Sequence, residues 1–194
     1  MNTDHIIVVY GPSGSGQDSV IEGITKRFDS ERVITTSSRE EMRPGEEQGK
    51  PYWFISKDEF EEGIREGRFI EWAQTYNDAY YGVTHDEIER VARSGKLGIW
   101  KVDWKGARSI RKLFPDIPIL FITAPIESLR ERLIKRDNPD EKYLQERMAF
   151  IEDLLSRPDL VYDYTIENLD GRLEEAVAEA ERIIRERFPD AKAL

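Results

Sequence analysis

The chain has 194 residues, a formal net charge of −10 and no cysteine, and 39% of its residues are hydrophobic. This length and composition indicate a folded protein of one or two small domains. The lack of cysteine excludes disulfides and thiolate metal sites, and the negative charge opposes non-specific attraction to nucleic acid or anionic membranes. Because Met1–Asp4 carries no basic leader and no long apolar run follows, we expect a cytoplasmic protein that binds neither nucleic acid nor membrane.

The first expected elements are a short strand, a glycine-rich loop and a helix. The apolar run Ile6–Val9 is β-branched and short enough for a buried strand, and the apolar residues from Val20 to Phe28 have helical spacing. Glycines let the intervening backbone turn its N–H groups inward, and the helix N-terminus favours an anion. We therefore predict a phosphate-binding loop made of Gly11, Pro12, Ser13, Gly14, Ser15, Gly16, Gln17, Asp18 and Ser19.

This loop departs from the Walker A pattern at two positions. Gly11 and Gly16 have the Walker A spacing, after which a lysine and then a serine or threonine are expected. Gln17 and Asp18 stand there instead, so the cation for the phosphates and the hydroxyl for Mg²⁺ are both missing. A glycine-rich turn that binds no ligand is the alternative interpretation of this segment.

Residues 35–95 differ from the rest of the chain in their pattern of aromatic and polar residues. The alternation Tyr52-Trp53-Phe54 and the run Phe69–Ala73 predict a small β-rich lobe inserted into the fold. At the end of this lobe, Thr84 and Glu87 have the spacing of a capping box, which predicts a helix that stops at Gly95.

The remaining expected elements alternate between strand and helix. Strands are predicted at 97–102, 117–122 and 164–167, and helices at 105–113, 127–136, 142–155 and 173–187. This alternation predicts an α/β fold with a parallel sheet and helices on both of its faces.

Five motifs occur in the order typical of guanylate kinases, and from end to end the chain resembles that family. They are the loop at 11–16, the segment 36–54 with its G-E-x-x-G-x-x-Y-x-F core, Ile70-Glu71-Trp72-Ala73, Tyr81-Gly82-Val83-Thr84, and Arg132-Leu133 followed by Arg136 and Arg147. The resemblance implies a P-loop NTPase-like core at 1–34, 96–131 and 151–194, a GMP-binding insertion at 35–95 and a helical lid at 132–150.

The resemblance implies transfer of the γ-phosphoryl group of ATP to GMP with Mg²⁺, in a monomer or homodimer. A nucleoside monophosphate carries about two negative charges, which suit a receptor of arginines and tyrosine hydroxyls. Glu71, framed by apolar residues, would accept from the guanine N–H groups. The substrate-binding residues implied are Thr35, Arg39, Arg43, Tyr52, Glu71, Tyr81, Thr84 and Asp103.

Two arginines of this set are one residue further apart than in the family pattern. Either a residue is inserted between Arg39 and Arg43, or Glu40 occupies the place of the first arginine. In the lid, Arg132 and Arg136 share a helix face, and Arg147 follows a turn signal at Asn138-Pro139. The lid arginines would close over the phosphates as catalytic residues, and Asn168 matches a family asparagine that lies near the adenine.

A lysine on a later strand offers a replacement for the missing loop cation. Where the family has a first aspartate, this chain has Lys101, and Lys101 and Asp103 lie on one face of the expected strand. That strand should end beside the phosphate loop. The hypothesis is a relocated pair, in which Lys101 supplies the catalytic cation and Asp18 holds Mg²⁺ or its waters. The alternative is that Lys101 and Asp18 form a structural ion pair in an inactive site.

Two other functions remain open at this stage. Loss of the loop lysine favours a non-catalytic relative, such as a GMP sensor or an interaction module. The run G-P-S-G-S-G-x-D-S with Tyr80–Val83 also resembles kinases of ribose bisphosphates, although those enzymes lack the segment conserved here at Gly45–Phe54. Binding of GMP compared with a base-free ribose phosphate would separate these possibilities.

Overall fold

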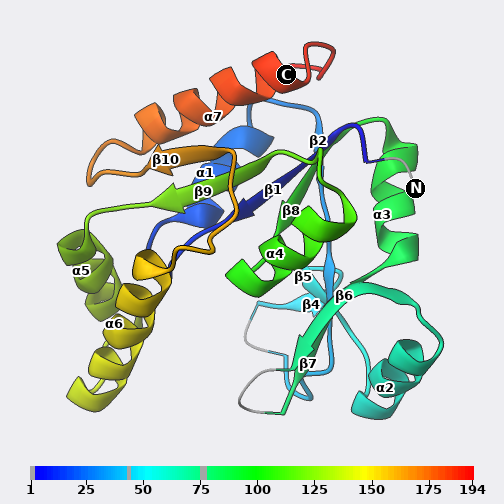
Figure 1. The fold of residues 1–194 in the computed structure, drawn as a ribbon, viewed down its shortest axis with the longest axis horizontal. Helices are drawn as coiled ribbons and strands as arrows, with labels where there is room; N and C mark the ends of the chain where they lie inside the picture. Colours follow the sequence, from blue (N-terminus) through cyan, green and yellow to red (C-terminus); the bar gives the residue numbers. More distant parts are fainter. Residues whose placement is uncertain (1–2, 43–44, 75–77) are drawn as a thin grey trace.

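The computed structural model describes residues 3–42, 45–74 and 78–194. Its centre is a five-stranded sheet in the order β10-β9-β1-β8-β2, and all of its strand pairs are parallel (Figure 1). This confirms the predicted α/β fold with a parallel sheet. The strands are β1 (Ile6–Tyr10), β2 (Ser30–Arg32), β8 (Leu97–Lys101), β9 (Ile119–Thr123) and β10 (Tyr164–Glu167).

Helices cover both faces of this sheet because alternate residues of its strands are buried on opposite sides. In β1, Ile7 and Val9 pack with apolar residues of α1 and α7, whereas Ile6 and Val8 pack with those of α3 and α4. The two layers are visible in Figure 1. The helices are α1 (Gln17–Thr25), α3 (His85–Ser94), α4 (Trp104–Leu113) and α7 (Leu173–Arg187).

The inserted segment forms a second five-stranded sheet in the order β4-β5-β3-β7-β6, in agreement with the predicted β-rich lobe. β3 pairs in parallel with β5, while β7 runs antiparallel to both β3 and β6. The strands are β3 (Thr35–Ser37), β4 (Glu47–Gln48), β5 (Pro51–Phe54), β6 (Phe69–Gln74) and β7 (Tyr80–Thr84).

The lobe also contains a helix that the sequence interpretation missed, α2 (Lys57–Arg65). Its start is a complete capping box, in which the side chain of Ser56 accepts from the Glu59 N–H and the Glu59 carboxylate accepts from the Ser56 N–H. The S-x-x-E pattern was therefore a usable signal for this helix. Phe60 is buried under the lobe, stacked on Phe69 at 4.1 Å between ring centroids.

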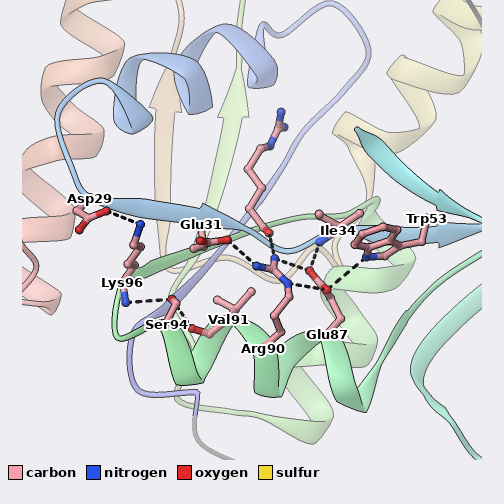
Figure 2. Close-up of polar contacts among 10 residues, drawn as sticks. Asp29, Glu31, Ile34, Trp53, Glu87, Arg90, Val91, Ser94 and Lys96 are labelled. Carbon is pink, nitrogen blue, oxygen red and sulfur yellow. Dashed lines mark hydrogen bonds and ion pairs between the residues drawn. The ribbon is translucent and has the colours of Figure 1, made fainter. Parts of the chain in front are cut away.

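α3 begins at Thr84, as expected, and ends at Gly95 in the left-handed conformation, with φ 66°. The Thr84 hydroxyl accepts from the Glu87 N–H at 3.2 Å. The second half of the predicted capping box is not formed, because the Glu87 carboxylate accepts from the Ile34 N–H at 2.7 Å and from Trp53 and Arg90 instead. Figure 2 shows this buried carboxylate at the junction of the two sheets.

Two antiparallel helices, α5 (Ile126–Asp137) and α6 (Glu141–Ser156), form a hairpin beside the parallel sheet. The predicted turn between them contains Asn138 with φ 41° and Asp140 as the N-cap of α6. The hairpin packs around its own small apolar cluster, which includes Leu129, Leu133 and Ile151. Among the described residues, no helix combines the length and apolar character needed to cross a bilayer.

Candidate active site

The glycine-rich loop, the end of β8 and the helical hairpin enclose a cavity of about 550 Å³. Its walls include the loop residues from Gly11 to Ser19 except Ser15, and the segment Lys101–Trp104. Arg132 and Arg136 line it from α5, and Phe150 is its aromatic contribution from α6. The loop and the relocated lysine that the sequence singled out therefore share one cavity.

The loop backbone has the conformation that a phosphate cradle requires. Gly14 and Gly16 have φ values of 85° and 81°, in the left-handed region that favours glycine. A Cβ at Gly11 would lie 2.0 Å from the Ile122 carbonyl oxygen, so only glycine fits there. The Ser15 hydroxyl is buried and has no partner within the described part of the chain. This loop is shaped like an anion site rather than an ordinary turn.

Gln17 closes the loop on itself. Its side-chain amide donates to the Gly11 carbonyl oxygen at 2.7 Å. A neutral donor therefore spans the loop where the Walker A pattern has a lysine, and it brings no positive charge to the cavity. The cation must come from elsewhere if this loop is to stabilise phosphates.

Lys101 brings a positive charge to the same cavity from the end of β8. Its ammonium lies 2.7 Å from one carboxylate oxygen of Asp18, and the Arg32 guanidinium lies 3.1 Å from the other oxygen. Burial opposes ionisation of Asp18, but the contacts with Lys101 and Arg32 outweigh it and hold the pKa of Asp18 below its usual value. The sequence interpretation paired Lys101 with Asp18 but missed Arg32, because no local pattern links the strand Ser30–Arg32 to the loop.

Arg132 of α5 and Asn168, which follows β10, both make hydrogen bonds to the backbone of the loop. Arg132 donates to the Gly14 carbonyl oxygen at 3.1 Å and to the Asn168 carbonyl oxygen at 2.7 Å, and it pairs with Asp170. The Asn168 side-chain amide donates to the Ser15 carbonyl oxygen at 2.8 Å. Both predicted site residues thus contact the loop backbone and fix its position.

The other two lid arginines lie further along the hairpin. Arg136 lines the cavity and makes two hydrogen bonds of 2.7 Å to its neighbour Asp137, which raise the pKa of the Arg136 guanidinium. Arg147 on α6 lies over the Tyr143 ring at 5.1 Å and is not among the residues that line the cavity. The structure therefore gathers Arg132 and Arg136 at the cavity and leaves Arg147 outside it.

On the inserted lobe, Arg39 and two tyrosines form a cluster. Arg39 pairs with Glu46 and lies over the rings of Phe54 and Tyr52 at 5.3 and 6.0 Å. Tyr52 and Tyr81 meet edge to face at 5.6 Å. Three residues of the predicted phosphate receptor, Arg39, Tyr52 and Tyr81, thus lie together on the lobe, and its other arginine, Arg43, lies outside the described residues.

The predicted base-binding residues Glu71 and Asp103 also approach each other. Burial, with the nearby charge of Asp103, raises the pKa of Glu71 to about 7. Asp103 is in addition the N-cap of α4, accepting from the Gly106 N–H at 2.7 Å. Two neighbouring carboxylates, one on β6 and one at the end of β8, create a strong acceptor site for N–H donors.

Two further predicted residues are held by the strands of the lobe. Thr35 is opposite Tyr52 in the β3–β5 ladder. The Thr84 hydroxyl is engaged as the N-cap of α3, so a structural role accounts for its position.

Comparison with known proteins places this arrangement in a family. The sequence profile of guanylate kinase matches residues 3–187. The chain belongs to the guanylate kinase family. The guanylate kinase of Coxiella burnetii is 32% identical over 190 residues, which cover 96% of this chain and 92% of that protein. The guanylate kinase of Symbiobacterium thermophilum is 37% identical over 180 residues, with coverages of 92% and 83%.

The fold agrees with this family membership. The crystal structure of guanylate kinase from Anaplasma phagocytophilum superposes with a TM-score of 0.66 over 97% of this chain and 89% of that chain, at 24% identity. The family likeness therefore extends over the core, the inserted lobe and the hairpin.

Proposed function

We propose that this protein transfers the γ-phosphoryl group of ATP to GMP, producing ADP and GDP. The observation that carries the proposal is the position of the Lys101 ammonium, 2.7 Å from Asp18 at the first turn of α1. The positive charge at the loop therefore comes from Lys101 on β8, whereas in the Walker A pattern it comes from a lysine of the loop itself. In phosphoryl transfer the protein mainly positions the reactants and supplies positive charge, so the strand that carries the cation need not matter.

The loop suits the phosphates of ATP. Gly14 and Gly16 adopt the left-handed conformation that lets the loop turn its backbone N–H groups inward. Proteins commonly hold Mg²⁺ through one or two carboxylates together with substrate phosphates, and Asp18 provides such a carboxylate. When bound, Mg²⁺ would neutralise part of the phosphate charge.

Asp18 acts as an internal substitute for the phosphates before they bind. In the structure its two oxygens are held by Lys101 and Arg32. Binding of ATP would transfer Lys101 from Asp18 to a phosphate oxygen and leave Asp18 to hold Mg²⁺ or its waters. Because Asp18 remains ionised throughout, this exchange requires no proton transfer.

The hairpin would complete the donor site. Arg132 contributes a fixed positive charge, since its guanidinium is tied to the loop backbone. Arg136 already lines the cavity, and closure of α5 and α6 would bring Arg147 towards the phosphates and exclude water. Through its hydrogen bond to the Ser15 carbonyl oxygen, Asn168 would fix the position of the loop relative to the adenine of ATP.

GMP would bind on the inserted lobe. Glu71 and Asp103 would accept from the adjacent N1–H and N2–H groups of guanine. These donors would favour the ionised form of Glu71, whose pKa is raised by burial and by the nearby charge of Asp103. The GMP phosphate would be held by Arg39, Tyr52 and Tyr81, with Arg43 as the second arginine. Thr35 and Thr84 would line the same site.

The proposed division of the chain follows these roles. The core comprises 1–34, 96–131 and 151–194, the GMP-binding insertion comprises 35–95, and the lid comprises 132–150. We further propose a cytoplasmic monomer or homodimer that works in purine nucleotide metabolism.

A GMP-binding protein without kinase activity is the second candidate, favoured by the direct ion pair of Lys101 with Asp18. A kinase for a phosphorylated ribose is less compatible with the site, because the paired carboxylates Glu71 and Asp103 would have no base donors to bind.

The test is a coupled assay of GDP formation from GMP, ATP and Mg²⁺. Lys101→Ala should reduce turnover by about a hundredfold or more, since it removes a cation that stabilises transition-state charge. The matched control is Lys96→Ala, which breaks a lysine–aspartate pair of 3.0 Å with Asp29 outside the cavity. If the wild type binds GMP and forms no GDP, the binding protein is the better description.

A further inference from the structure

Among the described residues that contact the loop, Arg32 is a cation to which the proposed function gives no role. It ends β2, the edge strand beside β8. Its guanidinium lies 3.1 Å from the Asp18 oxygen opposite the one that contacts Lys101. One carboxylate is therefore shared by two cations, and the start of α1 carries an excess of positive charge.

Asp18, the partner of Arg32, lines the cavity between the loop, the end of β8 and the hairpin, and Arg32 contacts it from outside that lining. Burial raises the pKa of Tyr52 on the inserted lobe, and the charge of Asp18 adds to this effect. The ion pair with Asp137 raises the pKa of Arg136 on the hairpin, and the charge of Asp18 again adds to it. A group beside Asp18 is thus within electrostatic reach of both the acceptor lobe and the lid.

The backbone of Arg32 is fixed, whereas its side chain can change partners. Arg90 donates to the Arg32 carbonyl oxygen at 2.9 Å. Arg90 is itself held by Glu87 and Glu31 (Figure 2). The Arg32 side chain is 44% exposed, and its contact with Asp18 uses a single nitrogen. Because a guanidinium has five N–H donors, most of them remain available to a ligand.

We propose that Arg32 is a further phosphate-binding residue, which contacts the phosphoryl group between the donor loop and the acceptor lobe. A phosphate would take the place of the Asp18 carboxylate on both cations, Lys101 from β8 and Arg32 from β2. The identity of the reaction rests on the proposed function, but the binding of phosphate by Arg32 does not.

The first test measures binding without Mg²⁺ and without turnover. Asp18→Asn removes the internal anion while keeping the size of the side chain, so its affinity for ATP in EDTA should exceed that of the wild type by about tenfold. Adding Arg32→Gln should lose most of this gain, and adding Arg32→Lys, which keeps the charge, should lose less. Arg93→Gln in the Asp18→Asn background is the control, since Arg93 pairs with Glu89 on exposed α3.

A second pair of variants leaves Arg32 intact, in case its replacement prevents folding. In Lys101→Ala, Asp18→Asn should still strengthen ATP binding, because Arg32 is released even when Lys101 is absent. The proposal is overturned if this gain disappears, or if Arg32→Gln leaves the ATP and GMP affinities of Asp18→Asn unchanged.

The turnover of the Arg32 variants separates this proposal from the proposed function. Arg32→Gln should lower kcat by about tenfold or more with a smaller change in KM, because the contact strengthens as charge develops on the transferring group. If the wild type forms no GDP while the binding results hold, the kinase proposal fails and Arg32 remains a phosphate ligand. If GDP forms and Arg32→Gln changes neither binding nor kcat, Arg32 is only a partner of Asp18.

Discussion

The two sides of the candidate site differ in how their chemistry is arranged. On the acceptor side, Glu71, Tyr52 and Tyr81 stand where the motifs of guanylate kinases lead one to expect them, and the structure brings them to one lobe. On the donor side, Gln17, Asp18 and Lys101 carry charges of 0, −1 and +1 where the family pattern has +1, 0 and −1. The sum is the same, but the groups that carry it have moved.

This difference follows from the physics of the two tasks. Coulomb attraction depends on where a charge lies in space, so a lysine on β8 can replace one on α1 if both reach the same point. Recognition of a base edge depends on hydrogen bonds of fixed direction, which tolerate little displacement. A phosphate site can therefore exchange its cations between strands, whereas a base site must keep its acceptors in place.

The strongest test of this comparison restores the family's charges. Lys101→Asp alone places two carboxylates together at the loop and should lower kcat by about a thousandfold or more. Combining it with Gln17→Lys and Asp18→Ser should recover much of that loss. The measurement is the coupled assay of GDP formation, and equal inactivity of the single and triple variants would contradict the exchange of charges.

A smaller effect is expected on the acceptor side. Glu71→Gln replaces one acceptor oxygen with an N–H₂ group that faces the guanine donors, so KM for GMP should rise by about thirtyfold while KM for ATP stays constant. Asp86→Asn, on the exposed start of α3, is the matched acidic control. Parallel losses of GMP and ATP binding would show that the two sides are not independent.

Breaking the junction of the two sheets should cost stability. Glu87 is 5% exposed and accepts from the Ile34 N–H and from Arg90. Glu87→Ala removes the acceptor of the Ile34 N–H and leaves Arg90 with only Glu31 and the Arg32 carbonyl oxygen. This should lower the free energy of unfolding by about 3 kcal/mol. Urea titration measures this, with Glu89→Ala on the same helix as a control that should change stability by less than about 0.5 kcal/mol.

The raised pKa of Glu71 also predicts a pH dependence. Because the pKa of Glu71 is raised in the folded chain from the ordinary glutamate value of 4.5 to about 7, this residue binds more protons in the folded state than in the unfolded state between those pH values. Its contribution to stability therefore falls as pH rises from 4.5 through about 7. Thermal melts of the wild type and Glu71→Gln should converge at low pH, and GMP should weaken this pH dependence.

The smallest expected effect concerns the helix that belongs to the acceptor lobe alone. Ser56→Ala removes the cap of α2 and should destabilise the lobe by about 1 kcal/mol. Hydrogen exchange of the α2 amides should speed up while the amides of β1 and β8 stay protected. Equal acceleration in the core would indicate that lobe and core unfold together.

The core of the fold could be predicted because its signals are local. Apolar runs such as Ile6–Val9 and the helical spacing of Leu173–Arg187 reproduce the observed elements to within a residue. The short edge strand β2 was missed because Ser30–Arg32 lacks apolar residues, and its place is fixed only by pairing with β8.

The residues of the candidate site could be predicted where they belong to a sequence motif. They were harder to predict where a side chain has several possible hydrogen-bond or ion-pair partners. The approach of Lys101 to Asp18 followed from strand geometry and charge. The helix cap at Thr84 was likewise predicted from a local pattern. The support of the loop backbone by Arg132 and the sharing of Asp18 by Arg32 depend instead on contacts between distant segments. Such contacts arise from packing, which no single segment of sequence encodes.

The shared carboxylate of Asp18 has a consequence for how ligand affinity responds to salt. In most anion sites the ligand displaces mobile ions from the cations, so affinity falls steeply as ionic strength rises. In the proposed site the displaced anion would be part of the chain. Salt would then weaken the ion pairs of Asp18 with Lys101 and Arg32 as it weakens those of the ligand. Phosphate binding should therefore depend only weakly on ionic strength.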